Sequence, residues 1–482
     1  MPRTRLLLCI IFFATAVQAQ PQSQIKQLGY VDAACSISPK EFNSWFVNGS
    51  ISKNGLVGFA DSVNFPTDNT KCDFYKWAHQ MFLWITSPVN GGILLDTATF
   101  YDMYTDGVDA STGDTIYRYV SNSPDTVNKG FALRDTKPQA IQPGGQAGGG
   151  DTLLSLNGSL VYFAVHANDV YAWFNTALTN KKLPATTPFP TTQAELNAVL
   201  SYANSQGAKI GDGNALTMEL KTAWIDAATV SNAADYVTIV AMVPNYVKTS
   251  DTQWTISTTA PTVQKTLALV GVHVVGPVQG HPEMVWATFE HRSNAPDNTF
   301  YFNDLLGKTQ SVPYNSTGQW NFMASGGSQT GALVAQMTVD STTGNINATP
   351  GNKIQANNVY RVNPWGNAPT QDSAENNSEL ISLNLDILVM LGLVGDVRSN
   401  YFQVGAVWTK DGSIPSGPTD AELIGSLLLA NSTMETYHQQ GTATSDQGCF
   451  GCHSASTSTG TSHVFSLTNI PLVSTGSTAK KK

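Results

Sequence analysis

"KTLALVGVHVVGPVQGHPEMVWATFEHR", residues 265–292, contains two runs of apolar and β-branched residues on either side of a short connection with glycine and proline. Runs of this composition around turn residues are typical of an antiparallel β-hairpin. Alternation along a strand puts Trp286 and Phe289 on opposite faces, so other parts of the chain are expected to cover both sides. We therefore predict an antiparallel hairpin that is buried on both faces.

Alternation through this stretch also places His273, Glu283 and Val285 on one face. A small site built from His273 and Glu283 is one interpretation, and ordinary cross-strand polar contact on a half-buried sheet is the simpler one. His281 and His291 lie ten residues apart, which is about 33 Å along a strand. They are therefore not expected to bind one metal ion together.

The rest of the chain alternates strand and helix patterns. Residues 74–87 predict an amphipathic helix that ends before Pro88. The other expected elements are strands at 91–104, two strands around the turn at Asn157 and Gly158 within 142–169, and helices at 192–206, 375–393 and 420–439. The predicted fold class is α+β, with a predominantly antiparallel β body and a few amphipathic helices.

The chain has 482 residues, enough for one large domain or two subdomains. A Pro- and Thr-rich stretch at 181–193 marks a possible boundary within a β-rich body that covers residues 20–430, and residues 431–482 form a separate carboxy-terminal segment. Charged residues make up only 13% of the chain and the net charge is −9, which argues against a nucleic-acid partner.

The amino-terminal stretch "MPRTRLLLCIIFFATAVQAQ" has two arginines, then a short apolar run, then small residues around a cleavage site. We expect a secretory signal at residues 1–19, which is removed together with Cys9, and a periplasmic or secreted protein of bacterial type. No later stretch reaches eighteen uninterrupted apolar residues, so no integral membrane segment is expected after cleavage.

Four cysteines remain after that cleavage. Cys35 and Cys72 lie far from the other two in sequence, and in an oxidising compartment they are expected to form a disulfide. This leaves the closely spaced Cys449 and Cys452 for another role.

The stretch "CFGCH", residues 449–453, has the spacing by which c-type haem is attached to proteins. Residues three apart share a face of a helical turn, so Cys449 and Cys452 can form thioethers to the two vinyl groups of one haem. His453 would then coordinate the iron as the proximal ligand. We predict one covalent haem c per chain.

Three other interpretations of the motif are open. A thioredoxin-like redox pair would need a strand–helix setting, which the Ser-, Thr- and Gly-rich surroundings do not provide. A structural zinc site would need two further ligands, for which His438 and His463 are available. The two cysteines could also simply form a disulfide. Only haem attachment uses both cysteines and the histidine together.

The second axial ligand is less well defined by the sequence. Only 29 residues follow His453 and none is a methionine, so we expect the haem segment to pack on the body instead of forming a self-contained cytochrome c domain. The candidates are His463, His438, Met434, a histidine of the body, or no protein ligand. Met434 is also compatible with core packing, and His438 with a solvated helix face.

Four stretches carry a resemblance to a known group of proteins. They are "QAGGGDTLLSLNGSLVYFAV", "ALVGVHVVGPVQGHPEMVWATFEH", "LANSTMETYHQ" and "CFGCH". Together they resemble a family of uncharacterised bacterial exported cytochrome-c-like proteins. The resemblance implies a single carboxy-terminal haem on a large body, attached through Cys449, Cys452 and His453, and it names no substrate or electron partner.

The sequence therefore predicts an exported mono-haem protein that transfers one electron at a time, with a redox partner protein that is basic because this chain is acidic. A haem-dependent oxidoreductase of peroxidase-like type, with an open distal site, is one alternative. A β-rich binding or surface protein is the other.

Overall fold

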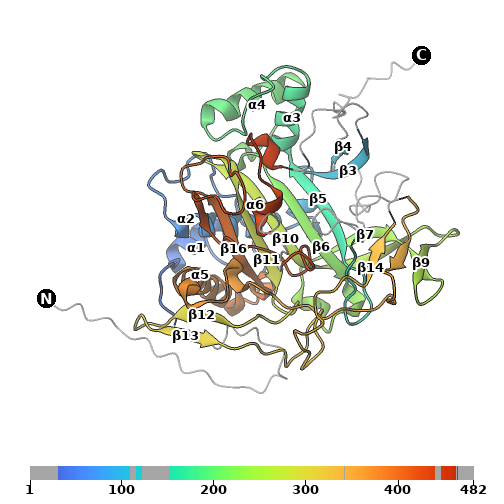
Figure 1. The fold of residues 1–482 in the computed structure, drawn as a ribbon. Helices are drawn as coiled ribbons and strands as arrows, with labels where there is room; N and C mark the ends of the chain where they lie inside the picture. Colours follow the sequence, from blue (N-terminus) through green and yellow to red (C-terminus); the bar gives the residue numbers. More distant parts are fainter. Residues whose placement is uncertain are drawn as a thin grey trace, which may run out of the picture.

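The computed structural model describes residues 31–108, 115–121, 151–340, 342–439, 447–462 and 464. The expected signal at 1–19 and the glycine-rich part of 142–150 lie outside these residues. Within them the fold is α+β with mostly antiparallel strands, as predicted (Figure 1).

One large sheet organises the described residues. Nine strands form it, in the order β17-β16-β11-β10-β6-β5-β3-β4, with β7 paired to one part of β10, and every pairing is antiparallel. Their bounds are β3 Phe100–Val108, β4 Thr115–Ser121, β5 Tyr162–Asn168, β6 Glu219–Asp226, β7 Thr238–Pro244, β10 Thr262–Val278, β11 His281–His291, β16 Tyr401–Thr409 and β17 Leu423–Gly425.

The predicted hairpin is confirmed as the centre of this sheet. Strand β10 is 17 residues long and pairs with β11, β6 and β7. A two-residue turn joins β10 to β11, and Gly280 in that turn has φ +81°, a conformation that glycine adopts without a steric penalty. Trp286 and Phe289 are 6% and 0% exposed, so both faces of the hairpin are covered, as expected.

The predicted shared face of His273, Glu283 and Val285 is wrong. His273 lies opposite Thr288, and Val278 lies opposite His281. Across a two-residue turn, odd-numbered residues of one strand face even-numbered residues of the other, so alternation cannot be counted straight through the turn. We call the face that carries Trp286, Thr288 and Glu290 the front face, and the face that carries Phe289 the rear face.

Two of the helices pack on the rear face. The α-helices of the described residues are α1 Pro39–Trp45, α2 Lys71–Ile85, α3 Asp169–Thr179, α4 Gln193–Ser205, α5 Ala374–Leu393 and α6 Cys449–Cys452. Helix α2 contacts β11 and β16, and the ring of Phe82 stacks on Phe289 with centroids 4.5 Å apart. Helix α5 packs beside it on β16. In Figure 1, α1 and α2 lie behind the sheet and α6 lies in front.

Helix α2 begins at a capping box. The side chain of Thr70 and that of Asp73 satisfy each other's backbone N–H groups, which explains why the helix starts three residues before the predicted position 74. The disulfide between Cys35 and Cys72 ties the first turn of α2 to the segment before α1, as predicted.

Helix α4 and helix α5 match the predicted helices at 192–206 and 375–393. Helix α3 was not predicted. Asn168 caps it by accepting a hydrogen bond from the backbone of Tyr171, so the buried strand β5 passes directly into a helix. Residues 181–193 connect α3 to α4, which contact each other, and Phe189 within this connection is fully buried.

Smaller sheets surround the main one. They are formed by β1 Pro88–Val89 with β2 Gly92–Ile93, by β12 Phe300–Asn303 with β13 Thr309–Val312, and by β14 Met337–Val339, β15 Ile346–Ala348, β9 Gln253–Ile256 and β8 Tyr246–Lys248. The predicted strand at 91–104 is in fact β2, a helical turn and the start of β3.

The helix expected at 420–439 is wrong. This region contains strand β17 and then hydrogen-bonded turns over 431–439. Asn431 and Ser432 donate to Thr288 and Glu290 on β11, so polar contacts with the sheet replace a regular helix. Residues 447–462 then cross the front face (Figure 1). No α-helix among the described residues combines the length and apolar character needed to cross a bilayer.

Candidate haem-attachment site

Helix α6 is a single turn that contains both cysteines of the motif. Gly448 before it has φ +69°, and a Cβ at this position would lie 2.4 Å from the carbonyl oxygen of Leu427. The turn is closed by the backbone N–H of His453, which donates to the oxygen of Cys449 at 2.9 Å. Cys449 is half-buried and Cys452 is exposed, and they do not form a disulfide.

The imidazole of His453 is held in one tautomer. Its Nδ1 lies 2.8 Å from the backbone oxygen of Thr461, which is fully buried. Because a carbonyl oxygen only accepts, Nδ1 must carry a proton, and in the neutral imidazole the lone pair is then on Nε2. Metal-binding histidines are commonly fixed in this way, with one ring nitrogen donating to a carbonyl so that the other is ready to coordinate.

Aromatic side chains fix the motif on the front face. The ring of Trp286 on β11 lies 4.1 Å from that of His453 and 5.9 Å from that of Phe450, measured between centroids. Phe450, one of the two spacer residues between the cysteines, is 2% exposed. The spacer therefore acts as an apolar anchor that sets the orientation of α6 on the sheet.

The chain after the motif is anchored by polar contacts. Ser462 donates to the carboxylate of Glu219 on β6 and lies 2.8 Å from the hydroxyl of Tyr171 on α3. Ser458 accepts the backbone N–H of Phe189 at 3.2 Å. Burial raises the pKa of Glu219 to about 7, although the Ser462 hydrogen bond and the charge of Lys221 oppose this shift. The motif is thus held from both sides.

A charged cluster lies beside the motif on the same face. It consists of Glu435, His273 on β10 and Lys221 on β6. Oε1 of Glu435 is 2.9 Å from Nε2 of His273, and Oε2 accepts the backbone N–H of Asn431 at 2.8 Å. His273 therefore contacts Glu435 and not Glu283, which instead contacts His281 and Thr409.

The cluster stabilises the charge on Glu435. Burial on its own would raise the pKa of Glu435, but the His273 ion pair, the charge of Lys221 and the Asn431 hydrogen bond together lower it to about 2. Burial lowers the pKa of Lys221, and the charges of Glu435 and Glu219 oppose that shift. The carboxylate of Glu435 is therefore ionised at neutral pH.

This ionised carboxylate predicts a pH dependence of stability. Its folded pKa lies below the ordinary value of 4.5, so its contribution is present above about pH 4.5 and is lost as the pH falls towards 2. The Glu435→Gln variant should lose at most about 3 kcal/mol of the free energy of unfolding at pH 7. The pKa shift sets this upper limit, and the loss is smaller because the side chain is 22% exposed and partly screened by water. Urea unfolding should show a smaller difference in stability between variant and wild type at pH 3 than at pH 7; an equal difference would contradict the lowered pKa of Glu435.

The thiol of Cys449 is not poised as a redox nucleophile. Burial raises its pKa well above the usual range, and the charges of Glu435 and Cys452 add to the shift. A thioredoxin-like cysteine needs a lowered pKa instead. For the zinc interpretation, the described residues contain no group of three His, Cys, Asp or Glu side chains arranged to hold a metal ion.

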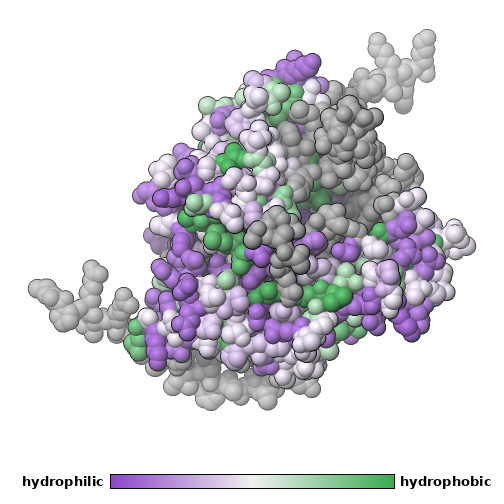
Figure 2. All heavy atoms as spheres, in the orientation of Figure 1, coloured by the Kyte–Doolittle hydropathy of each residue, from purple (hydrophilic) through white to green (hydrophobic). Residues whose placement is uncertain are grey.

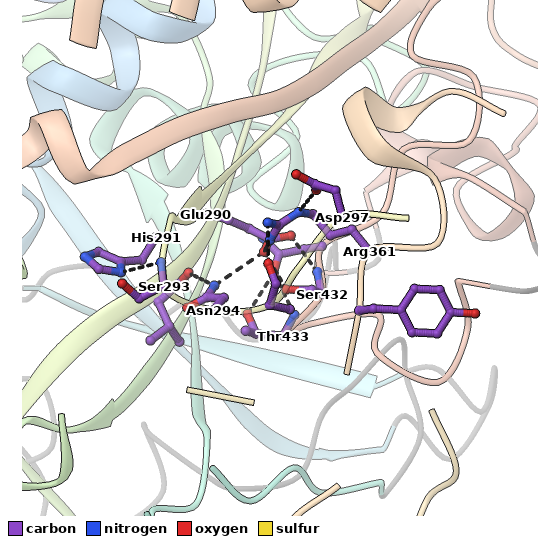
Figure 3. Close-up of polar contacts among 12 residues, drawn as sticks. Glu290, His291, Ser293, Asn294, Asp297, Arg361, Ser432 and Thr433 are labelled. Carbon is purple, nitrogen blue, oxygen red and sulfur yellow. Dashed lines mark hydrogen bonds and ion pairs between the residues drawn. The ribbon is translucent and has the colours of Figure 1, made fainter. Parts of the chain in front are cut away.

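A buried ionic network pins the chain just before the motif (Figure 3). Arg361 donates from Nε to Asp297 at 2.6 Å and from Nη1 to Glu290 on β11 at 2.9 Å. Glu290 also accepts the backbone N–H of Ser432 at 2.6 Å and the hydroxyl of the same residue. Asn294 donates to Glu290 and to the backbone oxygen of Val270. The network fixes residues 431–435 on the front face.

The predicted distal ligands lie in different surroundings. Met434 is fully buried in an apolar cluster with Phe322, Val359 and neighbouring side chains, a cluster that contains neither Cys449 nor Phe450. His438 is half-buried, and its Nε2 is buried without a hydrogen-bond partner. His463 lies outside the described residues.

A second polar chain was not predicted from the sequence. Nδ1 of His166 lies 3.0 Å from Asp102, and its Nε2 lies 3.0 Å from the hydroxyl of Thr222. The order of groups resembles a nucleophilic triad, but each of the three residues is at most 2% exposed. No substrate can reach them, so we interpret the chain as a structural link across β3, β5 and β6.

Figure 2 shows the front face in space-filling form, with apolar patches near the middle of a surface that is otherwise largely hydrophilic.

Comparisons of the chain with protein-family models, with curated proteins and with solved structures found no match.

Proposed function

We propose that this protein is an exported mono-haem c-type protein that carries single electrons. Cys449 and Cys452 would hold the porphyrin through thioethers, and His453 would coordinate its iron. The observation that carries the proposal is the hydrogen bond from Nδ1 of His453 to the carbonyl oxygen of Thr461. It leaves Nε2 as the nitrogen that would coordinate iron, on a histidine that directly follows a single turn with two thiols.

The surroundings support haem better than the alternatives do. The two cysteines do not form a disulfide, and the raised pKa of Cys449 disfavours its thiolate form. The motif is held in place by contacts of Phe450, Trp286 and Ser462. A zinc ion or a redox-active dithiol would use the thiols as thiolates, whereas thioether formation consumes neutral thiols by addition to vinyl groups.

Each residue has a separate task in this proposal. A bound haem would supply an iron that changes between the ferric and ferrous states. Thr461 keeps the proton on Nδ1 of His453 and so fixes which nitrogen points to the metal. Trp286 limits rotation of the imidazole through ring contact, and Phe450 keeps the attachment turn seated on the sheet.

The proposal is tested by expressing the full chain in a host with haem c maturation machinery. We expect intact-mass analysis to show one porphyrin adduct, and haem staining to survive denaturing electrophoresis. The Cys449→Ala/Cys452→Ala variant should lose both signals, while the Cys35→Ala/Cys72→Ala variant, the matched control, should keep them. An unmodified wild-type mass would reject the proposal.

The rival activity is a peroxidase-like reaction at an open iron site. It differs from electron carriage in the coordination of the ferric iron, which is high-spin and takes up cyanide readily when the sixth position is vacant. Absorption and electron paramagnetic resonance spectra of the purified protein distinguish the two.

A further inference from the structure

Seven of the eight histidines lie in the described part of the chain, and their positions limit which one could serve as a second axial ligand. Four of them are buried on the rear side of the sheet. They are His79 on α2, His166, His281 beside Phe74, and His291, whose two ring nitrogens contact Asp235 and Ser293. The sheet separates these from α6.

Besides His453, two described histidines remain, His273 and His438. The Nε2 atom of His273 already has a partner. This atom lies 2.9 Å from Oε1 of Glu435, and His273 is one of the causes that lower the pKa of Glu435. Coordination of a metal through Nε2 would break this contact and leave the carboxylate without this partner. Removing one partner of a polar pair that is largely withdrawn from water costs free energy.

His438 has the opposite character. Its Nε2 is buried and has no hydrogen-bond partner. A buried polar atom without a partner costs free energy and calls for an explanation, and a missing metal ion or ligand is one of the standard explanations. An imidazole nitrogen with an available lone pair is also a common metal ligand.

The turn that carries His438 lies on the front face of the sheet. The N–H of His438 donates to the oxygen of Glu435 at 3.0 Å, which closes a turn of the i to i+3 kind. Glu435 contacts His273 on this face of β10, and α6 packs on the same face through Phe450 and Trp286. His438 and the attachment turn are therefore both carried on the front face.

We infer that Nε2 of His438 is the sixth ligand of the iron whose proximal ligand is His453. The inference rests on the proposed function, and it selects a six-coordinate, low-spin haem that suits electron carriage. The network of Glu290, Arg361 and Asp297 would then have a functional role as well, because it fixes the start of the turn that presents His438.

The test uses the haem-loaded full chain and its ferric spectra. Wild type should be low-spin, and His438→Ala should be high-spin with the covalent haem retained. Cyanide should bind the variant at least about tenfold more tightly, since no side chain must be displaced. Added imidazole should restore the low-spin spectrum, which shows that the variant is folded and lacks only the ligand.

Matched variants decide between the candidates. His273→Ala, His463→Ala and Met434→Leu should each remain low-spin. If one of them becomes high-spin while His438→Ala does not, the assignment of His438 is overturned. A high-spin wild type also overturns it, although the covalent haem stands. If no porphyrin adduct is found in the wild type, the proposed function fails and this inference fails with it.

Discussion

The Arg361→Met variant is expected to unfold at a markedly lower urea concentration than wild type, with a loss of about 3–5 kcal/mol in the free energy of unfolding. Arg361 is 2% exposed and neutralises both Glu290 and Asp297. Methionine fills a similar volume but leaves two carboxylates in the interior without a cation. The size of the loss therefore comes from uncompensated buried charge and not from lost packing.

Urea titration followed by tryptophan fluorescence measures this loss. Lys248→Ala is the matched control, because Lys248 also forms an ion pair, with Asp251 at 2.8 Å, but on the surface. It should leave the midpoint unchanged, since exposed pairs contribute little. A wild-type-like midpoint for Arg361→Met would show that the network does not anchor the chain before helix α6.

Removal of the disulfide should have a comparable effect. The Cys35→Ala/Cys72→Ala variant releases a loop of 37 residues, which in the chain-entropy description corresponds to about 4 kcal/mol of lost stability. The cost is expected to arise mainly in the unfolded chain, which gains freedom. Thermal and urea unfolding of the variant and of the oxidised wild type measure it.

The control for this prediction also removes two cysteines. Cys449→Ala/Cys452→Ala opens no loop, because these residues form no disulfide, so in haem-free protein it should cost far less. Equal losses in the two double variants would show that cysteine burial, and not the cross-link, determines the effect.

The main elements were predictable where one segment carries its own signal. The hairpin of β10 and β11 follows from two apolar runs and a turn, and α5 follows from helical periodicity at 375–393. The prediction of a helix at 420–439 was wrong because Asn431 and Ser432 form hydrogen bonds with residues of β11 in place of a regular helix. Helix α3 was missed because strand β5 and the helix are both apolar, and only the cap at Asn168 marks the junction.

The candidate site shows the same limit of sequence analysis. Cys449, Cys452 and His453 lie within five consecutive residues, so their spacing alone singles them out as a candidate site. The groups that orient them could not, since Trp286 and Glu219 lie more than 150 positions earlier and only the fold brings them together. The pairing of His273 with Glu435 is also long-range, and the alternation rule misassigned it because it was counted through a turn.

The way the last part of the chain rests on the sheet also sets an order of events. Asn431 meets a partner 143 positions away, and Ser462 meets one 243 positions away. Contacts between such distant segments form late, because closing a long loop costs entropy that only a nearly finished sheet offsets. The thiol of Cys449 is consequently expected to be more exposed while the sheet assembles than after docking, when it is half-buried. Attachment of a group to Cys449 should therefore be easier before this last docking step than after it.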